Sequence, residues 1–256
     1  MPGWQPAHYL QFANERNRPA RDLLAQVLLT APSAVYDLGC GPGNSTELLA
    51  KRYPAARLVG VDNSPAMIAA ARKALPAVSL IEADLADWAP DAAADLLFSN
   101  AAFQWLPDHL AILCRLLRGL KPGGVLALQM PDNLEEPSHR LMRETGENGP
   151  WADKLRGAAA ARAMLPSPQA YYAALKPHCS RLDIWRTVYN HPLKGAPAIV
   201  EWLRATGLRP FLAPLSVEEQ TDFLADYEAR LAAAYPASFD GQALLRFPRL
   251  FLVAAV

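Results

Sequence analysis

The hydrophobic pattern of the first half of the chain alternates between short apolar runs and longer segments with one apolar face. Apolar runs of four to eight residues between turn residues predict buried strands, and apolar residues spaced three or four apart predict helices. The predicted strands are 34–36, 57–62, 78–85, 94–100 and 124–130, and the predicted helices between them are 45–50, 65–75 and 107–120. This strand–helix alternation predicts a doubly wound, Rossmann-like α/β sheet.

The rest of the chain predicts further elements around that sheet. Residues 181–189 alternate like a half-buried strand, and 244–256 supply a last strand. Ahead of the first strand, 7–12 and 20–29 are predicted as helices separated by the polar segment 14–19. Residues 131–168 are predicted to be helical and polar, and 192–239 to be helices broken at Pro197, Pro210 and Pro214.

These elements predict one domain of 256 residues with an inserted cap. The expected parts are an N-terminal lid (1–30), a cofactor-binding core (31–130), the remaining core (131–190 and 240–256) and a helical substrate cap (191–239).

The composition excludes several classes of protein. Lys and Arg total 25 and so do Asp and Glu, with no basic block, so nothing predicts binding to nucleic acid. The first nineteen residues lack a signal-peptide core, and the apolar end 250–256 is too short to span a membrane. The cysteines are widely spaced and odd in number, which indicates reduced thiols in a cytoplasmic protein without a metal or redox pair. They are Cys40, Cys114 and Cys179. The histidines, at 8, 109, 139, 178 and 191, show no metal-site spacing.

A glycine-rich loop joins the first predicted strand to the first helix of the alternation. It reads Asp37-Leu-Gly39-Cys-Gly41-Pro-Gly43, and Asn44 follows as the expected helix N-cap. Glycine lets the backbone turn and approach a ligand closely. The dinucleotide fingerprint would place its third glycine at Asn44, and no phosphate-loop motif is present. The loop therefore predicts a nucleotide-binding corner of another kind.

An acidic residue lies at the end of the second predicted strand. Asp62 ends the second strand, and Ser64 and Pro65 are predicted as N-cap and first residue of the next helix. A carboxylate at this place can accept hydrogen bonds from both hydroxyls of a ribose, whichever nucleoside cofactor carries it. Asp62 therefore predicts a nucleoside site without identifying the cofactor.

The loop resembles motif I of the class I S-adenosylmethionine-dependent methyltransferases. The resemblance implies that the methionyl half of the cofactor lies over the loop, that Asp84 takes the adenine amine and that Leu85 covers the ring. It also implies an antiparallel final strand pair, and places 100–105 beside the reactive methyl group. The implied cofactor-binding residues are Arg16, Asp37, Gly39, Gly41, Asn44, Asp62, Asn63, Met67, Asp84, Leu85, Asn100 and Ala101.

Further segments over nearly the whole chain resemble bacterial members of that family that methylate trans-aconitate. The resemblance implies methyl transfer to a carboxylate of this acid, giving a monomethyl ester and S-adenosylhomocysteine. The segments are 4–6, 9–12, 15–16, 100–101, 104–109, 129–133, 183–187, 205–210 and 247–251.

Carboxylate methylation needs no general base, because carboxyl groups with a pKa near 4 are already ionised at neutral pH. The expected contribution of the protein is alignment and exclusion of water. Neither a catalytic residue nor a metal is therefore expected. A tricarboxylate calls for arginines, and the candidates are Arg16, Arg18, Arg186, Arg209 and Arg246. Arg16 alternatively binds the carboxylate of the cofactor's methionine. The predicted substrate-binding residues are Arg18, Gln104, Trp105, Arg186 and Arg209.

Three other readings stay open at this point. The acceptor could be another small di- or tricarboxylic acid. The same sheet could serve a nicotinamide-dependent oxidoreductase, although Asn44 in place of the third glycine argues against it. The chain could also be a non-catalytic cofactor-binding or interaction module, against which the aromatic and arginine content of 191–239 argues. Fold alone does not decide among them.

Overall fold

A computed structural model describes residues 13–204 and 206–256, with the side chains of Ala13, Asn14, Arg16 and Ala159 left out. The described chain forms two compact units. We call the first the sheet unit (13–131, 165–187 and 250–256) and the second the helical unit (132–164 and 188–249). Parts of the strands β6 and β7 belong to each.

One seven-stranded sheet has the order β3-β2-β1-β4-β5-β7-β6. Its strands are β1 (Ala34–Leu38), β2 (Arg57–Asp62), β3 (Ser79–Glu82), β4 (Ala94–Asn100), β5 (Leu120–Pro131), β6 (Arg181–Leu193) and β7 (Ala243–Ala255). β1 pairs in parallel with both β2 and β4. The chain thus proceeds outward from β1 in one direction and then resumes at β4 in the other. Ligands of open α/β sheets bind at the carboxyl ends of the strands at such a point.

The last strand of the sheet runs antiparallel to β5. The Gly123 N–H donates to the Val256 carbonyl at 2.9 Å, and the Asp132 N–H donates to the Pro248 carbonyl at 2.9 Å. Rising numbers on β5 therefore pair with falling numbers on β7. The predicted mixed, doubly wound sheet is confirmed.

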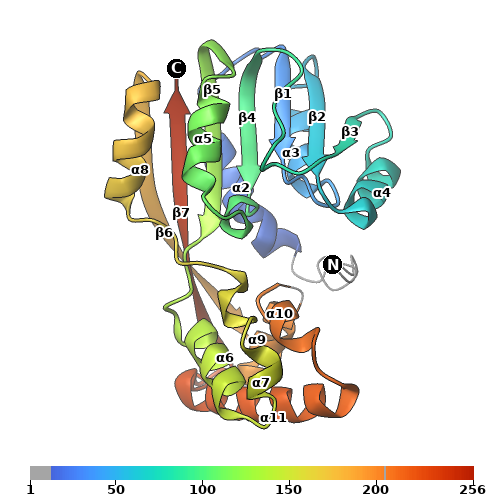
Figure 1. Ribbon diagram of the computed structural model, residues 1–256, viewed down its shortest axis with the longest axis vertical. Helices are drawn as coiled ribbons and strands as arrows, with labels where there is room; N and C mark the ends of the chain where they lie inside the picture. The colour runs from blue at the N-terminus through green and yellow to red at the C-terminus, as the bar shows by residue number, and fades with distance from the viewer. Residues whose placement is uncertain (1–12, 205) are drawn as a thin grey trace. The chain divides into compact units, whose positions relative to one another are not determined.

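Helices cover both faces of the sheet in the sheet unit (Figure 1). They are α2 (Ala13–Ala25), α3 (Asn44–Arg52), α4 (Pro65–Ala74), α5 (His109–Leu117) and α8 (Pro168–Leu175). In Figure 1, α5 and α8 lie in front of the sheet and α2 lies behind it. Leu113, Leu116 and Tyr171 bury their apolar faces against β4 and β5 residues in one core. The spacing of these leucines is what predicted the α5 helix.

The predicted break ahead of the sheet is wrong. The segment 14–19 lies inside α2, which contains Pro19. An internal proline costs a helix about 3 kcal/mol. Here Ala20, Leu23 and Leu24 are all at most 8% exposed, and their burial on one helix face offsets that cost. The helix predicted over 7–12 lies outside the described residues.

The start of α3 also differs from the prediction. Its N-cap is Gly43, with φ of 101°, and Asn44 is the first helical residue. The Asn44 side-chain amide donates instead to the Asn17 oxygen at 3.4 Å. The predicted start of α4 is confirmed, with Ser64 at the N-cap and Pro65 in the first turn.

The helical unit contains α6 (Pro137–Asn148), α7 (Ala152–Leu155), α9 (Gly195–Arg204), α10 (Arg209–Leu212) and α11 (Val217–Ala234). Its own core includes Trp151, Trp202, Phe211, Phe223 and Tyr227. The last of these helices opens with a capping box between Ser216 and Glu219.

Two of the three predicted proline breaks in this unit are wrong. Pro197 and Pro210 lie in the first turns of α9 and α10, where a missing N–H costs no helical hydrogen bond. Pro214 does lie between two helices, α10 and α11.

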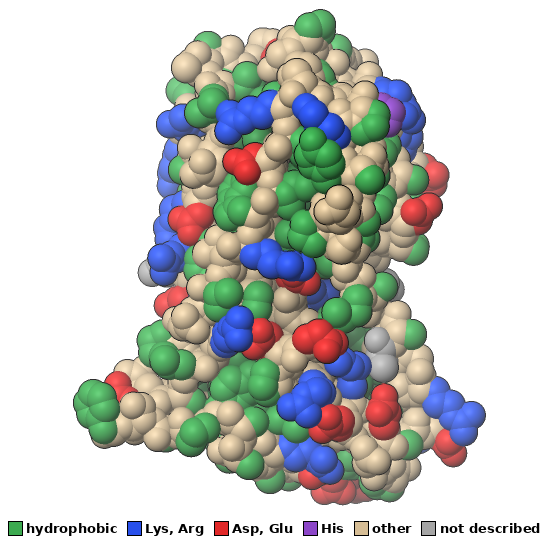
Figure 2. Space-filling model, turned by 90° about the vertical axis from the view of Figure 1, so that its left-hand side faces the viewer, with side chains coloured by type: hydrophobic (Ala, Val, Ile, Leu, Met, Phe, Trp, Pro, Cys, Tyr) green, Lys and Arg blue, Asp and Glu red, His purple; other side chains and the backbone are tan. Residues whose placement is uncertain are grey.

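Two further features were looked for within the described residues, a continuous basic patch and a helix that could span a membrane. On the face shown in Figure 2, Lys and Arg side chains are interspersed with acidic and hydrophobic ones and form no continuous basic patch. None of the helices that the structure describes has the length and apolar character needed to cross a membrane.

Candidate functional site

The glycine loop connects β1 to α3 at the carboxyl edge of the sheet. The N–H groups of Gly39 and Cys40 donate to the Val61 carbonyl at 2.8 and 3.0 Å, which ties the loop to the end of β2. Gly39 has φ of 74°, and a Cβ there would lie 2.2 Å from the Ala102 Cβ. Gly41 has φ of 55°, and a Cβ there would meet nothing within 4 Å. The loop is therefore packed on one side at Gly39 and opens to free space at Gly41.

Asp37, at the base of this loop, is fully buried. Its Oδ2 accepts hydrogen bonds from the Ser45 and Thr46 hydroxyls at 2.8 and 2.6 Å, which joins β1 to the first turn of α3. Its Oδ1 is buried and makes no hydrogen bond within the described part of the chain. Burial raises the pKa of Asp37 from 3.8 to about 6, against the lowering effect of the two hydroxyls. The carboxylate thus fixes the shape of the loop from below.

Asp62 closes the loop from the neighbouring strand. Its Oδ2 accepts from the Gly41 N–H at 2.9 Å, and its Oδ1 accepts from the Ser64 N–H at 2.9 Å. Burial raises the pKa of Asp62, and these two hydrogen bonds oppose the rise. Each carboxylate oxygen can accept a second hydrogen bond. Next to it, Asn63 is exposed and Met67 is buried in α4.

The exit of β3 lies beside the same loop. Asp84 is exposed, and its Oδ1 accepts from the Ala86 N–H at 2.9 Å. Leu85 is 6% exposed, and its Cδ1 lies 3.9 Å from the place of a Cβ on Gly39. Arg115 of α5 donates to the Leu85 carbonyl at 3.1 Å and holds this turn in place. An exposed carboxylate and an adjacent apolar side chain therefore lie next to the glycine loop.

The carboxyl end of β4 makes a strained turn against Gly39. Ala101 has φ of 59°, a left-handed conformation that costs about 1–2 kcal/mol in a residue with a Cβ. Its N–H donates to the Gln129 carbonyl at 2.9 Å, and the Gln104 side-chain amide donates to its carbonyl at 2.6 Å. Gln129 also donates to the Asn100 side chain at 2.5 Å. These bonds hold Asn100 and Ala101 at the strand end.

Gln104 and Trp105 follow that turn in a short 3₁₀ helix, η1 (Phe103–Trp105). Gln104 is 6% exposed, and its Oε1 makes no hydrogen bond to the residues that the structure describes. Trp105 is 39% exposed. The predicted pair is thus split between a buried amide and a half-exposed ring.

The structure places the predicted arginines in different surroundings. Arg18 is exposed on α2, with its Nε 3.8 Å from the Asp22 carboxylate, and Arg186 is exposed on β6. Arg209 begins α10 in the helical unit, and partial burial lowers its pKa. Arg246, also in the helical unit, lies 3.7 Å from Glu136. Arg16 is in α2, but its side chain lies outside the described set.

Sequence reasoning missed two arginines of the helical unit, Arg162 and Arg249. Arg249 is 6% exposed, and the guanidinium of Arg162 donates to the Asn133 oxygen at 2.8 Å. No motif spacing distinguishes them. The available signal was that Asn133 and Arg249 belong to two of the segments that carry the resemblance, 129–133 and 247–251.

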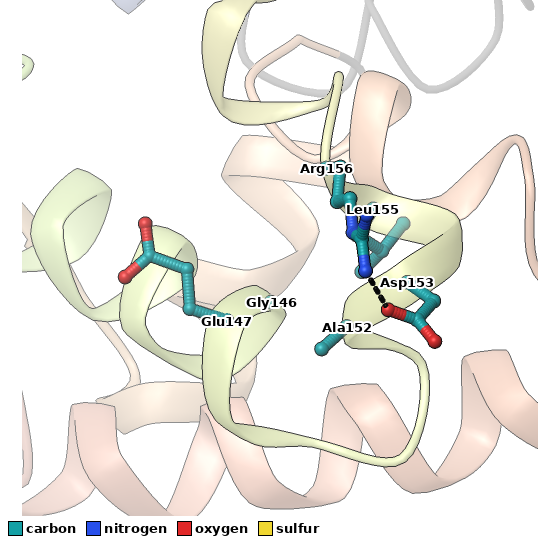
Figure 3. Close-up of a pocket in the computed structure, with 6 residues that line it drawn as sticks. All are labelled: Gly146, Glu147, Ala152, Asp153, Leu155 and Arg156. Atoms are coloured by element: carbon teal, nitrogen blue, oxygen red, sulfur yellow. Dashed lines mark hydrogen bonds and ion pairs between the residues drawn. The ribbon is translucent and has the colours of Figure 1, made fainter.

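A pocket of about 320 Å³ lies between α6 and α7 of the helical unit (Figure 3). Arg156 and Asp153 form an exposed ion pair at 2.6 Å on its wall, and Glu147 is directed away from that pair. None of the predicted site residues lines it. Within residues 13–204 and 206–256, no group of three or more His, Cys, Asp or Glu could hold a metal ion.

The fold and the glycine loop together define a class I methyltransferase, and a family model described as "Methyltransferase domain" matches residues 35–124. The chain is 58% identical to a trans-aconitate 2-methyltransferase of Rhodopseudomonas palustris (strain HaA2) over 254 residues, which cover 99% of both proteins. It is 56% identical to one of Yersinia pestis (strain Pestoides F) over 254 residues, covering 99% of this chain and 98% of that protein. The solved structure of YcgJ from Bacillus subtilis matches with a TM-score of 0.62 at 13% identity, covering 93% of this chain and 98% of that one. At that identity the structural match supports the fold alone.

The chain therefore belongs to the trans-aconitate 2-methyltransferase family. It is an S-adenosylmethionine-dependent methyltransferase, so the predicted class of enzyme and the predicted cofactor are confirmed. The interpretations of the chain as a nicotinamide-dependent oxidoreductase and as a non-catalytic module are therefore rejected.

Proposed function

We propose that the protein transfers a methyl group to a carboxylate of trans-aconitate and releases a monomethyl ester and S-adenosylhomocysteine. The observation that carries this proposal is that identity of 56–58% to relatives of that name extends over the full chain. It includes the helical unit and not only the segment 35–124 that matches the general methyltransferase model.

The geometry of the loop suits the cofactor. When bound, S-adenosylmethionine supplies a methyl group activated by its positively charged sulfur. The open space at Gly41 admits a ligand against the backbone, and the second acceptor sites of Asp62 suit two ribose hydroxyls. Asp84 and Leu85 offer an acceptor and an apolar surface for adenine. We assign the remaining predicted cofactor-binding residues to the same site, some as contacts and some as supports of the loop, namely Arg16, Asp37, Gly39, Asn44, Asn63, Met67, Asn100 and Ala101.

Among these residues, Asp37 acts from below the loop rather than on the ligand surface. Its Oδ2 is engaged by Ser45 and Thr46, and it is fully buried. We infer that it positions the N–H groups of the loop. Ala101 has a similar task, because its strained turn holds Ala102 against Gly39.

The reaction requires the protein to align the two reactants and does not require it to transfer a proton. An acceptor carboxylate is ionised at neutral pH and attacks the methyl carbon directly. Holding the two reactants in line is worth roughly 7–11 kcal/mol of the barrier. For the acceptor we propose contacts from Arg18, Gln104, Trp105, Arg186 and Arg209. The buried Oε1 of Gln104 lacks a described partner, so it can accept a hydrogen bond from an N–H or O–H group of a bound ligand.

We also infer that the reaction needs neither a metal nor a nucleic-acid partner and that it takes place in the cytoplasm. Support comes from the absence of a metal-ligand group in the described residues and from three free cysteines.

A screen of di- and tricarboxylic acids tests the function. Purified protein is incubated with methyl-labelled S-adenosylmethionine and each acid in turn, and methyl esters are identified by mass spectrometry. Trans-aconitate should have the highest kcat/KM. A higher value for another small acid would assign that acid as the acceptor, and no ester from any acid would refute the proposal.

A further inference from the structure

The turn that follows β3 is tied to helix α5 by a single arginine, and we call its residues 84–88 the β3 turn. Arg115 of α5 donates from Nη1 to the Asp87 carbonyl at 3.0 Å. Its Nη2 donates to the carbonyls of Leu85 and Ala86 at 3.1 and 2.6 Å. Three successive backbone carbonyls therefore share one guanidinium, whose N–H groups have a fixed planar geometry.

The N–H groups of the β3 turn are held from its other end by Asp84. The Asp84 Oδ1 accepts from the Ala86 N–H at 2.9 Å. The Asp84 carbonyl accepts from the N–H groups of Asp87 and Trp88 at 3.3 and 2.9 Å, and the second of these bonds closes one α-turn. The Asp84 side chain is exposed, so its second oxygen, Oδ2, can accept a hydrogen bond from a bound ligand. Arg115 and Asp84 thus fix the two ends of the same turn.

The strand that leads into the β3 turn gives it little support. β3 has four residues, lies at one edge of the sheet, and has three of its residues exposed. Two apolar contacts hold the turn in place, since Leu85 is buried and the Trp88 ring lies 5.5 Å from that of Tyr36. Apolar packing is non-directional, so it sets where the turn lies but not which way its peptide groups point. The hydrogen bonds to Arg115 set that direction.

Helix α5 is a firm support for this arginine. Leu113, Leu116 and Leu117 on either side of it are at most 1% exposed and belong to the core of the sheet unit. Hydrogen bonds from a charged donor are roughly twice as strong as those between neutral groups. Arg115 therefore connects an edge turn to the core of the sheet unit through three directional bonds.

We propose that Arg115 is a positioning residue for the cofactor. By fixing the β3 turn, it directs the Asp84 carboxylate at the 6-amino group of the adenine ring and keeps Leu85 against the ring, and so makes the site selective for a 6-aminopurine. The inference rests on the proposed function in one respect, the assignment of Asp84 and Leu85 to adenine. Arg115 itself acts through backbone carbonyls and does not touch the ligand.

The test compares two ligands that differ only at the base. One is S-adenosylhomocysteine, and the other is its purine analogue, which has hydrogen in place of the 6-amino group. Calorimetry gives the ratio of their Kd values, which we call the base ratio. The wild type should bind the analogue roughly tenfold more weakly, because the bond from the amino group to the carboxylate is lost.

Arg115→Met should lower the base ratio to within roughly twofold of one, because the affinity for S-adenosylhomocysteine falls toward that for the analogue. Asp84→Ala should do the same, since it removes the acceptor. The double variant should have the base ratio of either single variant, because both substitutions break one interaction. Arg115→Lys keeps the charge but has no planar fork, so its base ratio should lie between those of the wild type and Arg115→Met.

The matched control is Arg118→Met. Arg118 is the exposed C-cap residue of the same helix, so this variant also removes a positive charge near the helix end. It should keep the base ratio of the wild type. Hydrogen exchange without ligand gives a second measurement: Arg115→Met should speed exchange of the N–H groups of 86–88 and leave β4 unchanged.

The base ratio separates positioning from support of the fold alone. A merely structural arginine would weaken both ligands equally, so an unchanged base ratio in Arg115→Met and Arg115→Lys would overturn the inference. A base ratio of one in the wild type, or an equal fall in Arg118→Met, would overturn it as well. These measurements need no acceptor. The absence of any methyl ester in the screen of acids would therefore refute the proposed function and leave this result to judge Arg115 by itself.

Discussion

The glycine loop of the sheet unit and the arginines of the helical unit are built in different ways. The loop runs from Asp37 to Thr46, and glycine sets its backbone conformation and the open space at Gly41. In the helical unit Arg162 donates to the Asn133 oxygen at 2.8 Å, a contact between two side chains 29 residues apart in the sequence. A cofactor common to many methyltransferases can be held by the backbone, whereas the acceptor of one family must be recognised by placed side chains.

The two regions also carry their energetic costs differently. The sheet unit stores strain in the backbone at Ala101, and it leaves no room for a side chain at Gly39. In the helical unit the cost lies in charge, since the Arg249 guanidinium is buried and that of Arg162 is partly buried. Substitutions that add atoms should therefore damage the first region most, and substitutions that change charge should damage the second.

The largest effect is expected from Gly39→Ala. The new Cβ would lie 2.2 Å from the Ala102 Cβ at a φ of 74°, so backbone strain and overpacking add to several kcal/mol. Melting temperature and cofactor affinity should both collapse. Gly41→Ala is the matched control, because its Cβ would meet no protein atom within 4 Å. It should lower cofactor affinity, measured by calorimetry, far more than it lowers stability. Equal stability losses in the two variants would refute the described packing.

The next effect concerns acid stability and His139. Its pKa in the folded protein is about 3, below the ordinary 6.5, because burial and then Arg162 and Arg143 disfavour the charged form. The unfolded chain therefore binds more protons between these values, and stability present above pH 6.5 is lost as the pH falls toward 3. At roughly 1.4 kcal/mol per pKa unit the loss reaches several kcal/mol. His139→Gln should flatten this part of the denaturation profile.

Asp37, in the sheet unit, affects the pH dependence of stability in the opposite direction. Its folded pKa of about 6 lies above 3.8, mainly because of burial, so the folded protein binds the extra proton in this window. Stability from this group is present below pH 4 and is lost as the pH rises toward 6. Asp37→Asn removes this opposing contribution, so the free energy of unfolding should fall more steeply on acidification than in the wild type. His139→Gln should have the opposite effect and make that fall shallower. If neither variant changes the slope of unfolding free energy between pH 4 and 6, neither group is buried in the folded protein as described.

A smaller effect is expected from Asp62→Ala. Losing hydrogen bonds to a charged group should weaken S-adenosylmethionine binding by roughly 1.5–3 kcal/mol, about one to two decades in Kd. The structure adds a second reason, since Asp62 also accepts from the Gly41 N–H and so supports the loop. Asp62→Asn, which keeps one acceptor oxygen, should lose less. Titration of a folded Asp62→Ala with unchanged affinity would remove Asp62 from the site.

An effect of the same size is expected from Arg209→Ala in the helical unit. Removing a partly buried guanidinium that holds a carboxylate should lower kcat/KM for trans-aconitate by roughly 1.5–3 kcal/mol, through KM, with cofactor affinity nearly intact. A dicarboxylate should be affected less if it lacks the group that Arg209 holds. Steady-state kinetics together with ligand titration separate this from a loss of folding. Unchanged kinetics on every acid would make Arg209 structural and leave acceptor binding to the other arginines.

The sequence predicted the sheet well because its signals are local. Apolar runs such as 57–62 and 94–100, and the glycines at 39 and 41, specify their conformation within a few residues. The errors arose where tertiary contacts decide. The helix α2 continues through Pro19 because the residues that follow it are buried. The N-cap of α3 is Gly43 and not Asn44, and the next residues, Ser45 and Thr46, donate hydrogen bonds to Asp37.

The contact between Arg162 and Asn133 could not be predicted for the same reason. Arg162 follows an alanine-rich turn, where its sequence context resembles that of a surface residue, and only the fold brings it to Asn133. The predicted arginines at 18 and 186 prove to be exposed. Arginines that are far apart in the sequence form no periodic pattern, so their burial could not be inferred from it.

Hydrogen–deuterium exchange in the presence of each ligand tests the account most directly, because it reports both regions in one experiment. S-adenosylhomocysteine alone should slow exchange in the glycine loop, 38–46, and around Asp62. Adding trans-aconitate should then slow exchange around Arg209 and in α10. Slowing by the acid that spares α10 would contradict the assignment of the acceptor to the helical unit.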